Sequence, residues 1–378
     1  MSEESKKTDM QLKLLVNFCR VLLGFTFMFS GIVKAIDPVG SQIKFSDYLY
    51  AFGRGDMMLD STLLIFACLL AGFEILVGAY MLLGAFGKGT SLLVLIMMGV
   101  FTPFTLFLAI KNPVEDCGCF GDALVLTNWQ TFFKNLFLLG LAVWVFIKRE
   151  LIVPFVDEKR QWIITVVMTL IAVRFMTGNV KNLPVLDFRP YKVGTDLRGE
   201  VLGSARNPVF SDFSLMDFDM NDVTAEVLDN QGYTFLLVSP HVEDASDNGV
   251  DLIDDVFDYC SQWGYNMIGV TSSRSDAVRQ WTENAGAELR FVFCDEVPLQ
   301  TMVRSNPGLV LLRDGVIVNK WSYSRIPSDV ELSAPLDEIS VGYVPGPDPL
   351  RSPWAVILLF VLPLAMVVLI DKLIGMIQ

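Results

Sequence analysis

The stretch Asp116-Cys117-Gly118-Cys119-Phe120-Gly121-Asp122 is a polar, glycine-rich turn that separates two long apolar runs, residues 90–110 and 129–147. One glycine stands between its two cysteines, and glycine lets the backbone bring two thiols together. A ring closed over so short a span is strained, and strained, exposed disulfides are the ones that exchange with other thiols. The C-x-C pair is therefore a candidate redox site. The alternative is an inert turn or a static clip.

Apolar runs long enough to cross a membrane flank this turn and recur along the chain. The chain has 378 residues, and 52% of them are hydrophobic, a share typical of a membrane protein that carries a soluble part. A transmembrane helix needs roughly 20 apolar residues. Six runs approach this length: 13–36, 61–84, 90–110, 129–147, 161–178 and 353–371. We therefore predict an α-helical membrane bundle, with a soluble domain between the fifth and the sixth span.

The positions of Lys and Arg predict how the spans are oriented, because cytoplasmic loops carry an excess of these residues. Basic residues gather beside alternate span ends: Lys6, Lys7, Lys13, Lys88, Lys148, Arg149, Lys159 and Arg160. We therefore expect a protein of the bacterial cytoplasmic (inner) membrane with both termini in the cytoplasm. The C-x-C loop and residues 179–352 are then periplasmic. Arg174 makes the fifth span the weakest, and if that span does not cross, residues 179–352 lie inside.

Acidic residues are concentrated in one block of the chain. Residues 181–352 contain 27 Asp and Glu against 13 Lys and Arg, a net charge of −14, whereas the rest of the chain has a net charge of +1. Nucleic-acid binding needs clustered Lys and Arg, so we expect no nucleic-acid partner. The single histidine, His241, stands among polar residues, where we expect it to be solvated. We predict no metal site, because no Cys, His or carboxylate group has zinc-ligand spacing.

The acidic block reads as an α/β domain with a lead-in. Residues 181–230 are rich in Pro, Gly and Asp, which predicts an extended linker. Strand and helix patterns then alternate: strands at 233–239, 266–270 and 289–293, helices at 250–262, 276–285 and 298–304, and a hairpin of 309–312 with 316–321. The Asp314-Gly315 pair is a strong hairpin signal. We expect an open sheet that ends in an antiparallel ribbon.

The membrane part resembles a known family, on residues spread over positions 13–148. The motifs are Arg20-Val-Leu-Leu-Gly24, Ser30-Gly31-Ile-Val-Lys34, Gly72-Phe-Glu74, Cys117-Gly-Cys-Phe-Gly121 and Lys134-Asn135. They resemble the DoxX-like membrane family and its MauE-like (methylamine utilisation) branch. The resemblance implies a four-helix core over residues 1–150, and the apolar runs add further spans within 151–180 and 346–378. It also implies a relation to quinone-linked enzymes that form disulfides, with a quinone as the electron acceptor.

Residues 231–345 are similar to thioredoxin-like domains in the order of their strands and helices. That resemblance implies a cis-proline just before the strand that begins at Leu309, and Pro307 is the candidate. The redox C-x-x-C of thioredoxins would follow the first strand, where this chain has Ser239-Pro240-His241. Neither Cys260 nor Cys294 matches a thioredoxin catalytic position. We therefore expect a degenerate domain that binds a partner without dithiol chemistry.

Ionisable residues inside the spans are costly and usually have partners. Counted from the cytoplasmic span ends, Arg20 and Glu74 reach a similar depth, so we predict that they pair with each other. Such a pair is either a structural ion pair or a proton or quinone site. Lys34 and Lys134 fall near the C-x-C side, where an ammonium group favours the thiolate. The alternative is that both lysines extend to the membrane interface.

These patterns support two functions. The first is a thiol–disulfide oxidoreductase that uses Cys117 and Cys119 in redox exchange with an extracytoplasmic protein client, supported by Lys34, Lys134, Arg20 and Glu74. The second is a non-catalytic membrane scaffold or maturation factor. The sequence names neither the client nor the cysteine that attacks first.

Overall fold

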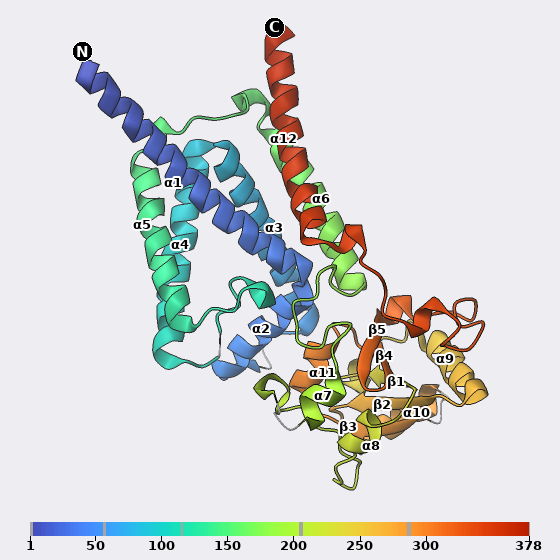
Figure 1. Cartoon of the computed structure of the whole chain (residues 1–378). Coiled ribbons are helices and arrows are strands. Elements are labelled where there is room, and N and C mark those ends of the chain that lie inside the picture. Colours follow the sequence, from blue (N-terminus) through green and yellow to red (C-terminus); the bar gives the residue numbers. More distant parts are fainter. Residues whose placement is uncertain (1–2, 56–57, 115, 204–206, 286–288, 378) are drawn as a thin grey trace. The chain divides into compact units, whose positions relative to one another are not determined.

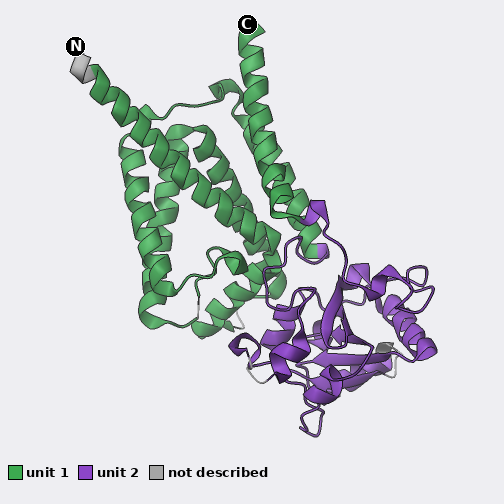
Figure 2. Cartoon of the chain, viewed as in Figure 1, with its two compact units in different colours: residues 1–180, 352–378 green, residues 181–351 purple. Residues whose placement is uncertain are grey.

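The computed structural model describes residues 3–55, 58–114, 116–203, 207–285 and 289–377. The chain divides into two compact units (Figure 2). Unit 1 comprises residues 1–180 and 352–378, and unit 2 comprises residues 181–351. The helix that follows unit 2 in the sequence therefore belongs to the same unit as the helices that precede it. We describe each unit by itself.

Long apolar helices make up unit 1 (Figure 1). In the described part of the chain, six helices are long and apolar enough to cross a membrane. They are α1 (Glu3–Ile36), α3 (Asp60–Leu83), α4 (Gly87–Lys111), α5 (Asn128–Ile147), α6 (Trp162–Lys181) and α12 (Pro353–Ile377). Each coincides with one of the six predicted spans, so the prediction of a helical membrane protein is confirmed. Arg174 does not interrupt α6, which is a continuous helix.

Four of these helices share one core. α1 packs on α3, α3 on α4, α4 on α5 and α5 on α1. Each contributes a buried aliphatic residue to that core, namely Leu23, Val77, Val94 and Leu138. The α1–α3 contact is especially close, because a Cβ atom added to Gly78 would lie 2.5 Å from the backbone nitrogen of Met28. Small residues at such crossings let helix backbones approach in membranes.

Helix α6 contacts this core through α3, and α12 contacts α6 and the segment that precedes it. The hydroxyl groups of Tyr80 on α3 and Thr165 on α6 lie 2.8 Å apart. Asp371 lies near the C-terminal end of α12, and its carboxylate is 2.5 Å from Nε of Arg160. The start of α1 and the end of α12 lie at one end of unit 1, and the C-x-C loop lies at the opposite end (Figure 1). This arrangement is compatible with an even number of crossings.

A further helix of unit 1, α2 (Pro38–Ala51), lies between the first two predicted spans and was not identified from the sequence. Asp37 is its N-cap and accepts a hydrogen bond from the Gly40 amide at 2.8 Å, and Pro38 occupies the first helical position. Pro at this position and Asp before it form a known helix-start signal. The signal was present in the sequence, but the helix is too short and polar to stand out as a span.

Unit 2 contains a five-stranded sheet of order β3-β2-β1-β4-β5. The strands are β1 (Tyr233–Val238), β2 (Asn266–Thr271), β3 (Arg290–Phe293), β4 (Gly308–Arg313) and β5 (Val316–Ser322). β1, β2 and β3 are parallel, whereas β4 is antiparallel to both β1 and β5. The predicted hairpin is confirmed, and its turn residues Asp314 and Gly315 have φ of +51° and +80°. The predicted α/β alternation is confirmed as well.

Helices and loops cover both faces of this sheet. Alternate residues of β1 point to opposite faces, so Phe235 and Leu237 join one core cluster while Leu236 and Val238 join the other. Helices α9 (Val250–Trp263) and α10 (Ser275–Ala285) contribute to the first cluster, and α11 (Glu296–Met302) contributes to the second.

The prediction of an extended linker at residues 181–230 is wrong. This segment contains helices α7 (Leu197–Leu202) and α8 (Thr224–Leu228), and it supplies the buried core residues Tyr191, Phe213 and Leu215. Its Pro, Gly and Asp residues form the turns between short packed pieces. The sheet needs a cover on both faces, and on this face the segment provides much of it.

Candidate functional site

The C-x-C loop joins α4 to α5 and is fixed at both ends. Gly118 has φ of +60°, a conformation that glycine adopts without strain, and its amide donates to Oδ1 of Asp116 at 2.7 Å. Thr127 begins α5 with a capping box, because its hydroxyl accepts from the Gln130 amide and the Gln130 side chain accepts from the Thr127 amide. Within this loop Cys117 is buried and Cys119 is half-buried.

The backbone of Cys119 is held by two side chains of α1. Its carbonyl oxygen accepts hydrogen bonds from Oγ of Ser30 and from Nζ of Lys34, both at 2.8 Å. Lys34 is only 6% exposed, so its ammonium group depends on protein partners. It finds them in the Cys119 carbonyl, in Oγ of Ser30 at 2.7 Å and in Oε2 of Glu74 at 2.9 Å. The prediction that Lys34 lies beside the C-x-C pair is thereby supported.

The predicted pairing of Arg20 with Glu74 is wrong. Nη1 of Arg20 donates to the carbonyl oxygens of Met81 and Leu82, at 2.6 and 3.3 Å, near the end of α3. Carbonyl groups at a helix C-terminus have no partners within the helix and attract cations. Arg20 and Lys34 are 14 positions apart on α1, or about 21 Å along the axis. Glu74 lies at the level of Lys34.

Helix α2 holds the other half of the loop. The hydroxyl of Tyr48 donates to the carbonyl oxygen of Cys117, and Nζ of Lys44 pairs with Asp116 at 3.0 Å. Tyr48 is buried, and burial together with nearby Asp116 raises its pKa, so the phenol keeps its proton. Ser30 belongs to a family motif but had no predicted role, and Lys44 and Tyr48 were not predicted as site residues. The N-cap and proline of α2 could have revealed the helix that carries two of them.

Lys134 of α5 lies on the ring of Phe120, with Nζ 4.0 Å from the ring centroid. Phe120 follows Cys119 directly and is buried. An ammonium over an aromatic face is a favourable cation–π contact. The next residue of α5, Asn135, donates to Oγ1 of Thr105 at 3.2 Å, which ties α5 to α4. Lys134 is therefore close in sequence and in space to the loop.

A cavity of about 110 Å³ brings these residues together within unit 1. Cys117, Cys119, Lys34, Lys134 and Glu74 all line it. Its remaining walls are mostly apolar and include Phe27, Phe45, Leu70, Met98, Phe101, Phe104 and Leu138. Glu74 is the one carboxylate among the described residues that line it. Five of the six predicted membrane-site residues thus share one cavity, and Arg20 does not belong to it.

Pro307 occupies the predicted place in unit 2, directly before β4, and its peptide bond to Asn306 is cis as expected. Nearby, where a thioredoxin would carry C-x-x-C, polar contacts close the loop. Oγ of Ser239 donates to Oδ1 of Asn306 at 2.6 Å, and Nδ2 of Asn306 donates to the His241 carbonyl at 2.7 Å. No cysteine is part of this group.

The cysteines of unit 2 are poor nucleophiles. Burial raises the pKa of Cys260 and of Cys294 to about 12, so neither forms a thiolate near neutral pH. His241 is not simply solvated, which corrects the sequence prediction. Its Nε2 lies 3.0 Å from Oε1 of Glu296, and this hydrogen bond raises the pKa of His241. A carboxylate 55 positions away in the sequence gave no local signal.

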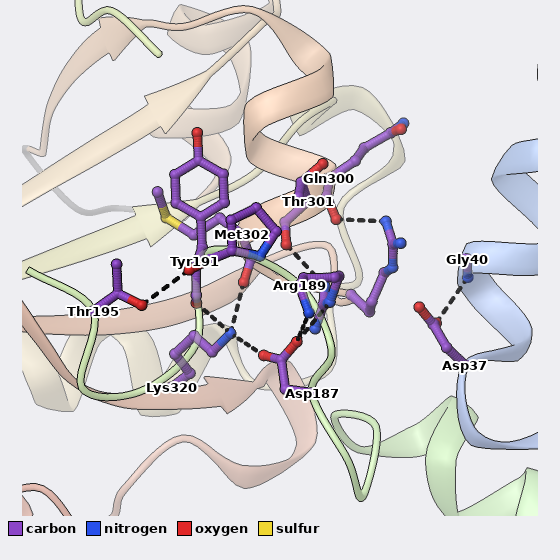
Figure 3. Close-up of polar contacts among 12 residues, drawn as sticks. Asp37, Gly40, Asp187, Arg189, Tyr191, Thr195, Gln300, Thr301, Met302 and Lys320 are labelled. Atoms are coloured by element: carbon purple, nitrogen blue, oxygen red, sulfur yellow. Dashed lines mark hydrogen bonds and ion pairs between the residues drawn. The ribbon is translucent and has the colours of Figure 1, made fainter. Parts of the chain in front are cut away.

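A buried ionic cluster fastens the first segment of unit 2 to the sheet (Figure 3). Nζ of Lys320 on β5 donates to Oδ2 of Asp187 at 2.5 Å, to the Tyr191 carbonyl at 2.8 Å and to the Met302 carbonyl at 3.0 Å. Nε of Arg189 donates to the other oxygen of Asp187 at 2.9 Å. Burial lowers the pKa of Lys320 to about 8. We interpret this cluster as structural, because these hydrogen bonds all join residues of unit 2 to one another.

Comparison with known proteins finds a family match within unit 1. Residues 12–148 match the family model of methylamine utilisation protein MauE. The MauE match includes the C-x-C loop and all five residues of the cavity named above. It begins within α1, includes α2 to α5 and ends before α6. The other spans and unit 2 lie outside the MauE match.

One solved structure is weakly similar to part of the chain. A proposed protein disulfide isomerase from Bacteroides thetaiotaomicron, solved in solution, is similar with a TM-score of 0.26 and 16% sequence identity. The similarity covers 36% of this chain and 82% of that one. No curated protein matches this chain. Among the residues that the structure describes, no three His, Cys, Asp or Glu side chains are grouped to hold a metal ion.

Proposed function

We propose that this protein is a membrane thiol–disulfide oxidoreductase that uses the Cys117/Cys119 pair. The observation that carries the proposal is the pair of hydrogen bonds that the buried Lys34 and Ser30 donate to the Cys119 carbonyl. These residues line a cavity that is also lined by Lys134. An inert surface turn does not require a buried, paired lysine to fix its backbone. Holding a reactive group in one geometry is how proteins lower the cost of reaching a transition state.

The proposed reaction is the oxidation of a client dithiol. A client thiolate attacks one sulfur of the Cys117–Cys119 disulfide, a mixed disulfide forms, and the second cysteine leaves as a thiolate. The second client thiolate then attacks the client sulfur of the mixed disulfide. This step releases a client disulfide and leaves both cysteines reduced. Lys134 stabilises the leaving thiolate, since a nearby ammonium favours that form.

Reoxidation of the pair needs an acceptor for two electrons and two protons, and we propose a quinone. The cavity fits a planar apolar ring, because phenylalanine side chains form much of its wall. Lys134 and Asn135 also line it and offer donors to a carbonyl oxygen. When bound, a quinone would supply the oxidising power. The residues of this chain would orient it and exclude water.

The proposal also covers the kind of fold that each unit has and the side of the membrane on which it lies. The core formed by α1, α3, α4 and α5 is DoxX-like, and unit 2 is a degenerate thioredoxin-like domain that holds a periplasmic client. The C-x-C loop and unit 2 are on the periplasmic side of the bacterial inner membrane.

Cysteines placed at Lys88 and at Asn248, both exposed, test this topology. In whole cells an impermeant thiol reagent should label only position 248. Labelling of position 88 instead would reverse the orientation.

A trapping experiment tests the chemistry. Cys117→Ser and Cys119→Ser are expressed singly in cells, and extracts are run on non-reducing gels. At least one variant should form a covalent adduct that reductant removes, because the resolving thiol is missing. The double variant is the negative control, and the Cys260→Ser/Cys294→Ser variant should retain activity. If neither single variant forms an adduct and both keep wild-type function, the protein is a non-catalytic scaffold.

A further inference from the structure

Unit 2 contains a second cavity, separate from the C-x-C site. Its volume is about 280 Å³, and it is lined by Val242, Glu243, Ala245, Asp247, Val250, Ala277, Gln280 and Trp281. These residues come from the loop after β1, the first residue of α9 and the middle of α10. Open α/β sheets bind ligands beyond the carboxyl ends of their strands. The cavity lies beyond the carboxyl end of β1, and α10 follows the carboxyl end of β2.

Two carboxylates set the charge of this cavity. Glu243 and Asp247 line it, and the eight lining residues include no Lys, Arg or His. The carboxylate of Glu243 is held in place, because Oγ of Ser273 donates to its Oε2 at 2.5 Å and accepts from the Val242 amide at 3.0 Å. The hydrogen bond from Ser273 also lowers the pKa of Glu243. Glu243 therefore stays ionised.

An aromatic wall completes the cavity. Trp281 is half-buried, and its ring packs edge-to-face on Phe291, with centroids 5.6 Å apart and planes at 76°. This contact fixes the orientation of the indole. Val242, Ala245 and Ala277 also line the cavity and add apolar surface. An indole, two carboxylates and short apolar side chains are the groups that a cation on an aliphatic stem requires.

We propose that this cavity binds the side chain of an arginine in a polypeptide partner. A guanidinium group is planar, so it can stack on the indole and donate to carboxylates at the same time, whereas an ammonium is a point charge. Long-range electrostatic attraction also favours a basic polypeptide, because residues 181–352 have a net charge of −14. This inference does not depend on the redox chemistry proposed for Cys117 and Cys119.

The test uses the purified full-length protein in detergent at low ionic strength. The probe is a capped pentapeptide, Gly-Gly-Arg-Gly-Gly, and the comparison peptide has citrulline in place of arginine, which removes the charge and keeps the shape. Calorimetric titration should show at least about tenfold tighter binding of the arginine peptide. The Glu243→Gln/Asp247→Asn variant should lose about the same factor. Trp281→Leu should weaken binding several-fold, by removal of the cation–π contact.

A matched control separates the cavity from general charge. The Asp255→Asn/Asp258→Asn variant also removes two negative charges, but from positions on α9 that do not line the cavity. It should bind the arginine peptide as the wild type does. Equal loss in the control and the cavity variant would reduce the effect to long-range attraction and overturn the proposal. Equal binding of both peptides, or no measurable binding of either, would overturn it as well.

Discussion

Nζ of Lys34 lies 2.9 Å from Oε2 of Glu74 inside the helical core of unit 1, and both side chains are buried. The pair links α1 to α3, and the same ammonium holds the carbonyl of Cys119. The positive charge of Lys34 is thus balanced by Glu74, and Lys34 acts on the loop through a hydrogen bond. Lys134, by contrast, lies on the aromatic ring of Phe120. We therefore expect Lys134 to act on the cysteines through its charge.

Breaking the Lys34–Glu74 pair on one side should cost more than removing it altogether. Lys34→Met leaves a buried carboxylate without its partner and should lower the free energy of unfolding by about 3–5 kcal/mol. Lys34→Met/Glu74→Gln should recover much of that loss, because no charge is left unpaired. Denaturation in mixed micelles measures both. Client oxidation should stay slow in the double variant, since the bond to Cys119 is still missing. Full recovery of the rate would contradict a positioning role for Lys34.

Arg20 and Glu74 should behave independently. Arg20 contacts carbonyl oxygens at the end of α3, whereas Glu74 contacts Lys34. Distant residues without shared partners usually give additive effects, within about 0.5 kcal/mol. The free energies of unfolding of Arg20→Gln, Glu74→Gln and the double variant provide the cycle. A rescue of either single variant by the other would show that the two residues interact after all.

Lys134 should control the reactivity of the cysteine pair at neutral pH. Lys134→Met removes an ammonium from the cavity and should slow alkylation of the reduced pair about tenfold, because less thiolate is present. Lys134→Arg keeps the charge and should retain most of the rate. Lys88→Met, on an exposed side chain, is the control and should change nothing. Equal rates in Lys134→Met and the wild type would remove Lys134 from the mechanism.

The His241–Glu296 pair should make unit 2 slightly less stable as the pH rises. The hydrogen bond from Glu296 raises the folded-state pKa of His241 above its ordinary value of 6.5. Its stabilisation is therefore complete below pH 6.5 and is lost as the pH passes through the raised pKa. Both side chains are partly exposed, so we expect less than about 1 kcal/mol.

The chain contains one histidine, which makes this effect easy to isolate. The thermal midpoint of the wild type, measured from pH 5.5 to 8 and compared with that of Glu296→Gln, should show a difference that shrinks with pH. A difference that grows with pH would mean that the pair is not formed as described.

The parts of the structure that the sequence predicted well depend on local patterns. Apolar length predicted six helices, and alternation together with Asp314-Gly315 predicted the sheet and its hairpin. The Arg20–Glu74 pairing failed because depth was counted from predicted span ends, which do not give the register of two packed helices. In the structure Gly78 packs against Met28, and in this register Glu74 lies beside Lys34.

The remaining errors concern contacts between distant segments. Residues 181–230 look like a linker by composition, since nothing local shows that Phe213 and Leu215 cover a sheet built from later residues. Helix α2 was missed because it is short and polar, and nothing local shows that Tyr48 contacts Cys117, which is 69 positions away. The C-x-C pair and its lysines were found because family motifs and rare charges in apolar runs mark them directly.

The Asp187–Lys320 contact has a consequence for how unit 2 is made. The two residues are 133 positions apart, so Asp187 leaves the ribosome long before Lys320 does. Tyr191 and Phe213 pack against strands that are synthesised after them, and they stay uncovered in the meantime. A domain built from such distant contacts folds slowly and passes through states that aggregate. Unit 2 should therefore require a chaperone until its last strand has emerged.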